Sequence, residues 1–157
     1  MCEITDDLTD AGREVLQNIA ERKVHVLHIE AHEGTPAFSY TVGLWHNFEQ
    51  PEVLVFGLEP DVADDLLHTL ADACIDGKRF AAGEKHEGLL EGFAVRFLDV
   101  PEQKAGELYG GASWAYQNKP FRGVQLIWPD KERRWPWQEG VRQGFRDMQP
   151  MLSPHDA

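Results

Sequence analysis

Two strand-like runs joined by a short turn constrain this chain more than any other feature. Residues 24–32 and 37–44 are β-type runs with alternating patterns, and the turn-forming string HEGTP lies between them. Such a short connection joins antiparallel strands, because parallel strands need a crossover of a dozen or more residues. The sequence therefore predicts an antiparallel hairpin near the start of the sheet.

The rest of the chain alternates between strand-like and helix-like patterns. Further strands are expected at the runs 52–57, 92–101 and 123–128. Helices are expected at about 10–22, 60–76, 102–117 and in a short segment ending near 149. The stretch 77–92, rich in glycine and charge, is expected to be loop. These elements predict a single compact α+β domain over residues 1–157, with a mostly antiparallel sheet flanked by two or three helices.

Length and composition set the broad class of the chain. Its 157 residues can bury the core of one domain, and 42% hydrophobic residues is typical of globular proteins. No apolar run is long enough to span a bilayer, and the acidic N-terminal arm, residues 1–8, is unlike a secretory signal or a basic transit peptide. We therefore expect a cytoplasmic location and no membrane partner.

The charge of the chain is large and unevenly distributed. The formal net charge is −12, which argues against nucleic acid as a partner because nucleic-acid binding needs a cationic surface. Residues 119–146, however, hold seven of the 15 basic residues and three of the 27 acidic ones. This basic segment would be the place for an anionic ligand.

The string WPDKERRWPW, residues 128–137, concentrates groups that bind ligands. Tryptophan and arginine planes stack on flat molecules, arginine pairs with carboxylate or phosphate, and the two prolines stiffen the loop. The candidate ligand-binding residues of the loop are Trp128, Asp130, Arg133, Arg134, Trp135 and Trp137. The alternative is a loop packed onto its own domain, with its arginines stacked on tryptophans and paired with Asp130 or Glu132.

The end of the second strand offers a second candidate segment. Tyr40 and Thr41 present hydroxyls on opposite faces, and Gly43 allows a bulge or a close approach of another backbone. In one interpretation Tyr40 and Thr41 line a pocket. In the other, Gly43 is a bend that lets the hairpin pack, and the Tyr40 hydroxyl is hydrogen-bonded to backbone. The leading hypothesis joins both segments into one cleft that binds a small anionic or aromatic molecule, or the acidic segment of a partner.

Histidines suggest a metal site as an alternative. His28, Glu30 and His32 alternate along the first strand and therefore share a face, and His46 could approach from the next strand. Two imidazoles and a carboxylate form a known ligand set for zinc or non-haem iron, which would make the protein a metal-dependent hydrolase or oxygenase. A solvated polar face is the competing interpretation.

Other chemistries find little support in the sequence. Cys2 and Cys74 are too few for a disulfide framework or a cysteine-only zinc site. There is no G-x-S-x-G elbow, and no phosphate-binding glycine motif. Glu49, Glu52 and Asp130 can serve as acid–base groups, but the sequence brings no two of them together.

Four strings in order resemble a known family. They are PAFSYTVGL at 36–44, PEVLVFGL at 51–58, VQLIWPDKERRWPW at 124–137 and QPML at 149–152. Over about residues 15–152 the chain resembles a bacterial family known as domain of unknown function 4262. The resemblance implies a compact stand-alone domain and supplies no catalytic residues. Members of the family often begin with two cysteines spaced C-x-x-C. In this chain Thr5 stands where the second cysteine would follow Cys2, which puts a metal or redox role for a thiol pair in doubt.

A regulatory or immunity-type interaction domain is a third hypothesis for the function.

Overall fold

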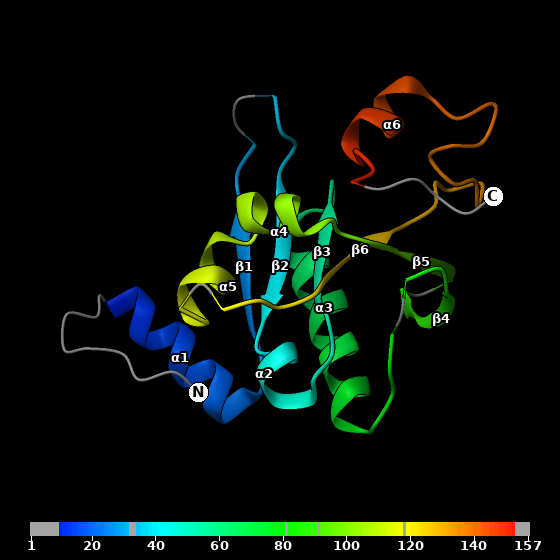
Figure 1. Ribbon diagram of the computed structural model, residues 1–157. Helices are drawn as coiled ribbons and strands as arrows, with labels where there is room; N and C mark the ends of the chain where they lie inside the picture. The colour runs from blue at the N-terminus through cyan, green and yellow to red at the C-terminus, as the bar shows by residue number, and fades with distance from the viewer. Residues whose placement is uncertain (1–9, 32–33, 81, 91, 118, 153–157) are drawn as a thin grey trace.

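The sheet of this protein is mostly antiparallel. The computed structural model describes residues 10–31, 34–80, 82–90, 92–117 and 119–152. The strands within these ranges are β1 (His25–Ile29), β2 (Phe38–Val42), β3 (Glu52–Phe56), β4 (Lys85–Leu90), β5 (Phe93–Asp99) and β6 (Gly123–Ile127). They form one sheet in the order β1-β2-β3-β6-β5-β4 (Figure 1). Only β3 and β6 pair in parallel, so the predicted α+β class is confirmed.

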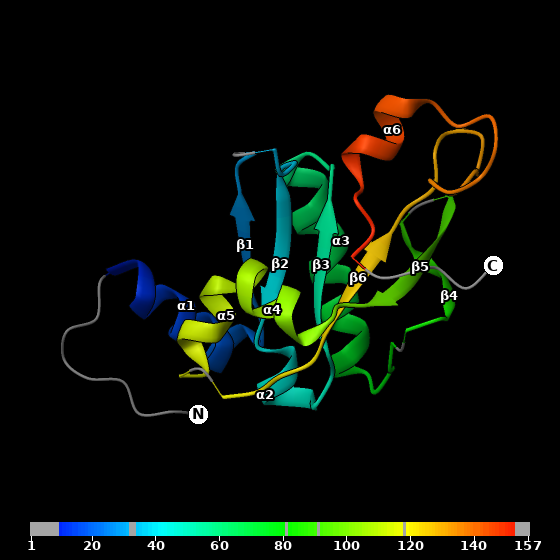
Figure 2. The ribbon, with the colours of Figure 1, turned by 45° about the horizontal axis from the view of Figure 1, so that its top comes forward.

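Helices cover both faces of the sheet. They are α1 (Asp10–Arg22), α2 (Leu44–Phe48), α3 (Pro60–Ile75), α4 (Glu102–Leu108), α5 (Gly110–Ala115) and α6 (Gln143–Met148). Helix α3 packs on one face, and α1, α4 and α5 pack on the other (Figures 1 and 2). None of the helices in the described ranges is long and apolar enough to cross a membrane.

Helix α3 buries most of the apolar stripe expected from its sequence, but Val62, the first residue of that stripe, is 42% exposed. Leu66, Leu67, Leu70 and Cys74 are buried on the face that meets the sheet. Pro60 begins the helix, where its missing N–H group is not needed. Burial, the larger cause, and the charge of Glu52 together raise the pKa of the Cys74 thiol to about 11. A raised pKa is typical of a cysteine in the core. Cys2 lies outside the described residues.

Gly43 follows β2 and turns the chain into α2. Its φ of 125° favours glycine, and a Cβ there would lie 2.6 Å from the carbonyl oxygen of Lys23. The close backbone approach expected at Gly43 is therefore confirmed. The strand expected to reach residue 44 ends at Val42, because residues 44–48 form a helix that the sequence pattern did not predict.

The prediction of a loop over residues 77–92 is wrong for the second half of that stretch. Lys85–Leu90 form β4, an edge strand that pairs with β5. Its side chains are exposed or half-buried, so its sequence lacks the apolar alternation by which strands are found. Between the pairs His86–Val95 and Leu90–Phe93 the register shifts, and β4 carries two extra residues.

The weak helix expected over 102–117 is broken into α4 and α5 at Tyr109. Gly111 lets α5 lie close to the sheet, because a Cβ there would be 2.3 Å from Leu27 Cδ1 and 2.8 Å from the Tyr40 hydroxyl. The N–H of Gly111 donates to that hydroxyl at 2.7 Å. The break therefore fixes α5 against β2.

Two buried glutamines hold the C-terminal segment to β6. The Gln149 amide accepts from the N–H of Trp128 at 3.0 Å and donates to its carbonyl at 2.8 Å. The Gln125 amide likewise donates to the carbonyl of Pro150 at 2.7 Å and accepts from the N–H of Leu152 at 2.9 Å. Each side chain thus mimics a neighbouring strand.

We expect Gln149→Ala to loosen this attachment. Gln149 is 1% exposed, and its loss removes two hydrogen bonds worth about 1 kcal/mol each. Hydrogen exchange of the Trp128 amide should become faster. Gln143→Ala is the matched control, because the Gln143 amide donates to Asp147 on the surface. Equal exchange rates in both variants would contradict a role for Gln149 as an anchor.

Candidate functional site

Tyr40 and Thr41 are buried, and their hydroxyls are bound within the protein. The Tyr40 ring lies edge-on to Tyr109 with the ring centroids 5.2 Å apart. Its hydroxyl accepts the Gly111 N–H, and burial raises its pKa. The Thr41 hydroxyl donates to Glu52 at 2.8 Å and accepts from the N–H of Val53 at 2.9 Å. Both residues therefore hold the fold together, and neither lines the clefts described below.

Glu52, at the start of β3, is a fully buried carboxylate. Its donors are the hydroxyls of Thr41 (2.8 Å) and Tyr116 (2.5 Å) and the N–H groups of Gly43 (3.1 Å), Leu44 (3.2 Å) and Trp45 (3.1 Å). Burial raises the pKa of Glu52, and these hydrogen bonds act in the opposite direction. A carboxylate has about four acceptor positions, so five donors occupy it fully. Glu52 therefore caps the first turn of α2.

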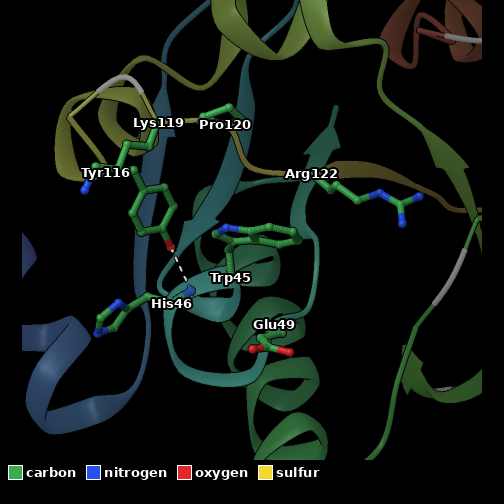
Figure 3. Close-up of a pocket in the computed structure, with 7 residues that line it drawn as sticks. All are labelled: Trp45, His46, Glu49, Tyr116, Lys119, Pro120 and Arg122. Atoms are coloured by element: carbon green, nitrogen blue, oxygen red, sulfur yellow. Dashed lines mark hydrogen bonds between the residues drawn. The ribbon is translucent and has the colours of Figure 1, made fainter. Parts of the chain in front are cut away.

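Tyr116 connects this buried carboxylate to the surface. Besides donating to Glu52, its hydroxyl accepts from the N–H of Gly43 at 3.0 Å and of His46 at 3.4 Å. Burial, followed by the charge of Glu52, raises the pKa of Tyr116. Its ring forms part of the wall of a surface cavity (Figure 3).

This cavity belongs to what we call the Trp45 cleft. Two adjoining cavities of about 760 and 450 Å³ share Trp45, Pro120 and Arg122. Figure 3 shows the Trp45 indole at the centre of the first cavity, with the Arg122 side chain extending away from it. Arg122 is 3.6 Å from Asp99, so its charge is compensated. The charged residues of the whole cleft are Lys119, Arg122, Glu49, Asp99 and Glu102, with His46 beside them.

The loop 128–137 is held by its own polar groups. Asp130 accepts from the N–H groups of Glu132 and Arg134, both at 2.9 Å, and pairs with the Arg134 guanidinium at 3.1 Å. The pKa of Asp130 is lowered, first by the hydrogen bond from the backbone N–H of Arg134 and also by the Arg134 guanidinium. Arg134 also contacts Glu132 at 2.7 Å. The Trp128 indole donates to the Phe56 carbonyl at 2.8 Å. These contacts match the ion pairing expected if the loop packs onto its own domain. The expected stacking differs, because the arginine over Trp135 and Trp137 is Arg96 of β5, and Arg133 lies over Phe93.

Trp135 and Trp137 form a stack beside β5. Their ring centroids are 5.6 Å apart with an interplanar angle of 8°. The Arg96 guanidinium lies 5.8 Å from the Trp135 centroid and 5.6 Å from that of Trp137. This stack fixes the orientation of Trp135.

Arg133 points to a separate cavity, which we call the Arg133 cleft. The cleft has a volume of about 850 Å³, and its walls include Lys85, Glu87, Phe93, Pro129, Arg133 and Trp135. Arg133 has a φ of 65°, which is unusual for a residue other than glycine. One of its guanidinium N–H groups donates to the Gly92 carbonyl at 3.0 Å, and the guanidinium lies 5.6 Å from the centre of the Phe93 ring. The bulge of β4 forms another wall.

The single cleft expected from residues 40–45 and 128–137 is not formed. The Trp45 cleft includes Gly123, at the first residue of β6, whereas the loop follows the last residue of β6. The two segments therefore lie at opposite ends of this strand. Of the expected ligand-binding residues, Arg133 and Trp135 meet in the Arg133 cleft, and Trp128, Asp130 and Arg134 line a different cavity.

The described part of the histidine strand does not converge on a metal site. His28 Nδ1 is 2.7 Å from the Ser39 hydroxyl, and its Nε2 is 3.4 Å from Asp64 on α3. Glu30 is exposed beyond the end of β1, and His32 lies outside the described residues. Within the ranges that the structure describes, no three His, Cys, Asp or Glu side chains are placed to hold a metal ion.

Two residues that form the clefts, Lys85 and Tyr116, carry no signal of that role in the sequence. Lys85 lies in the polar strand β4, whose pattern is that of a loop, and Tyr116 lies in a segment whose pattern indicates only a weak helix. The proximity of Tyr116 to Glu52, 64 residues away, leaves no local pattern in the sequence.

Comparison with known proteins gives one match. A model of the family described as "Domain of unknown function (DUF4262)" matches residues 18–142. No curated protein and no solved structure matches the chain.

Proposed function

Because the chain belongs to the DUF4262 family, whose description assigns no activity, we propose a function from the geometry of the chain itself: it is a binding module that holds a small organic anion with a flat or apolar body in the Arg133 cleft. The observation that carries this proposal is the meeting of Arg133, Lys85 and Trp135 in one cavity.

The charge of the cleft supports an anionic ligand. Among the lining residues that the structure describes, Lys85 and Arg133 face one acid, Glu87, so this part of the wall is cationic in a chain whose net charge is −12. The planar Arg133 guanidinium carries five N–H donors, which suit a carboxylate, sulfonate or phosphate group. The Trp45 cleft holds more acids than cations, which disfavours an anion there.

The apolar walls support a flat or apolar body. Trp135 and Phe93 present rings, and Pro129 stiffens the loop that connects β6 to Trp135. The stack of Trp135 on Trp137 holds the wall in place before a ligand arrives, which lowers the entropy cost of binding. A volume of about 850 Å³ lies within the range usual for small-molecule sites.

The proposal is tested with naphthalene-2-sulfonate, a flat apolar molecule with one fixed negative charge, by titration into ¹⁵N-labelled protein. The Trp135 indole resonance should shift, and Arg133→Ala should weaken binding by about tenfold or more, since it removes a charged hydrogen-bond donor. The matched control is Arg142→Ala, which removes the same charge from the basic segment outside the cleft. Equal weakening by both variants, or shifts confined to the Trp45 indole, would contradict the proposal.

A further inference from the structure

The loop 128–137 also borders a second groove, which is separate from the Arg133 cleft. This Met148 groove has a volume of about 680 Å³ and lies between the loop and α6. Its apolar residues are Trp128, Phe145 and Met148, and its basic residues are Lys131, Arg134 and Arg142. Figures 1 and 2 both place α6 and the preceding loop at one corner of the molecule, away from the helical layers.

The apolar floor of the groove remains accessible. Met148 is 40% exposed, and Met151, three residues later, is 38% exposed. The Trp128 ring lies edge-on to Phe145 with the centroids 5.0 Å apart, and α6 has no buried residue. Methionine side chains are flexible and polarisable, so a surface containing them adapts to the apolar side chains of a partner.

Among the residues that the structure describes, the lining of the groove holds three basic residues and two acidic ones. Arg134 is paired with Asp130 and Glu132, which leaves Lys131 and Arg142 to set the sign of the rim. Neither Lys131 nor Arg142 forms an ion pair with any residue that the structure describes. An apolar floor with a cationic rim is complementary to a segment that carries apolar anchors among acidic residues.

We propose that the Met148 groove docks an acidic peptide segment of a partner protein, whose apolar side chains lie against Trp128, Phe145 and Met148 and whose carboxylates pair with Lys131 and Arg142. This surface is distinct from the Arg133 cleft and does not depend on a ligand there. The short-range charge pairs set the orientation of the segment, and the apolar contacts supply most of the affinity.

The test selects peptides from a random display library with the full chain as bait and measures their affinity by fluorescence anisotropy. The selected peptides should combine Asp or Glu with large apolar residues. Met148→Asp should weaken peptide binding by about tenfold or more, because it removes an apolar contact and places a negative charge opposite the acidic peptide. Val62→Asp on α3 is the matched control, because Val62 is 42% exposed and lies outside the groove.

A charge exchange tests the rim independently of the floor. Arg142→Glu should weaken the acidic peptides and should favour peptides in which lysine replaces the acids. Arg133→Ala should leave peptide binding unchanged, which separates this proposal from the small-molecule site. The proposal is overturned if no peptide is enriched, if the enriched peptides lack acidic residues, or if Met148→Asp binds them as tightly as the wild type. A dimer seen by light scattering and abolished by Met148→Asp would also overturn it, in favour of a second copy as the occupant.

Discussion

Glu52→Gln is expected to lower the free energy of unfolding by about 3 kcal/mol or more at neutral pH. Glutamine keeps the size of the side chain but replaces one carboxylate oxygen with an NH₂ group. That group would face N–H and O–H donors that now reach Glu52 Oε1 or Oε2, so several buried donors would lose their acceptor. Leaving one such donor unsatisfied costs about 1–3 kcal/mol.

Urea unfolding of paired variants measures this loss. Glu49→Gln is the control, because it makes the same chemical change on an exposed residue at the end of α2, and it should alter stability by less than about 0.5 kcal/mol. If Glu52→Gln is as stable as Glu49→Gln, the five hydrogen bonds are not what fixes α2.

The pH dependence of the same comparison gives a second readout. Burial raises the pKa of Glu52 above its ordinary value of 4.5, so the folded state binds the proton more tightly than the unfolded state does. The contribution of Glu52 to stability is therefore largest below the unfolded pKa and falls as the pH rises through the folded pKa. The stability difference between wild type and Glu52→Gln should shrink over this interval and then stay constant. The opposite slope would show that hydrogen bonding to the carboxylate outweighs its burial.

Gly43→Ala is the second substitution with a large expected effect, a loss of roughly 3 kcal/mol of stability. A methyl group at a φ of 125° is strained, and here it would also lie 2.6 Å from the Lys23 carbonyl oxygen and 3.2 Å from the Val24 Cα, neither of which is a mobile side-chain end. A shift of Gly43 to relieve the contact would move its N–H away from Glu52.

Gly77→Ala separates the two causes of this loss. Gly77 has a φ of 94°, but nothing lies within 4 Å of a Cβ built there. It should lose only about 1 kcal/mol, the cost of the backbone conformation alone. Thermal unfolding of both variants decides the matter, and equal losses would mean that the contact with Lys23 is easily relieved.

The sequence predicted those parts of the fold that local patterns encode. The hairpin, the apolar stripe of α3 and the strand containing Glu52 follow from periodicity and from turn-forming residues. The pairing of Arg134 with Asp130 belongs to the alternative in which the loop packs onto its own domain, with its arginines paired with Asp130 or Glu132. Local patterns also explain the errors, since the polar edge strand β4 and the short helix α2 have no distinctive periodicity.

The candidate sites were harder to predict than the fold. Arg133 and Trp135 were named from composition, but Lys85 comes from a strand that was expected to be loop. Tyr40 and Thr41 were expected at a pocket, yet their hydroxyls are bound by Gly111, Glu52 and Val53. Which polar groups of a chain satisfy one another depends on contacts between distant segments, and no spacing in the sequence records them.

The parallel pairing of β3 with β6 has a consequence during synthesis of the chain. Strand β6 is the last described strand to leave the ribosome, yet it occupies the middle of the sheet, between β3 and β5. A β1-β2-β3 sheet formed before β6 arrives would have unpaired backbone groups along β3, beside Val53 and Val55. That edge is a site for misassembly with other chains. Productive folding therefore depends on how quickly residues 123–127 reach it, and a ribosomal pause before this strand would lengthen the exposure.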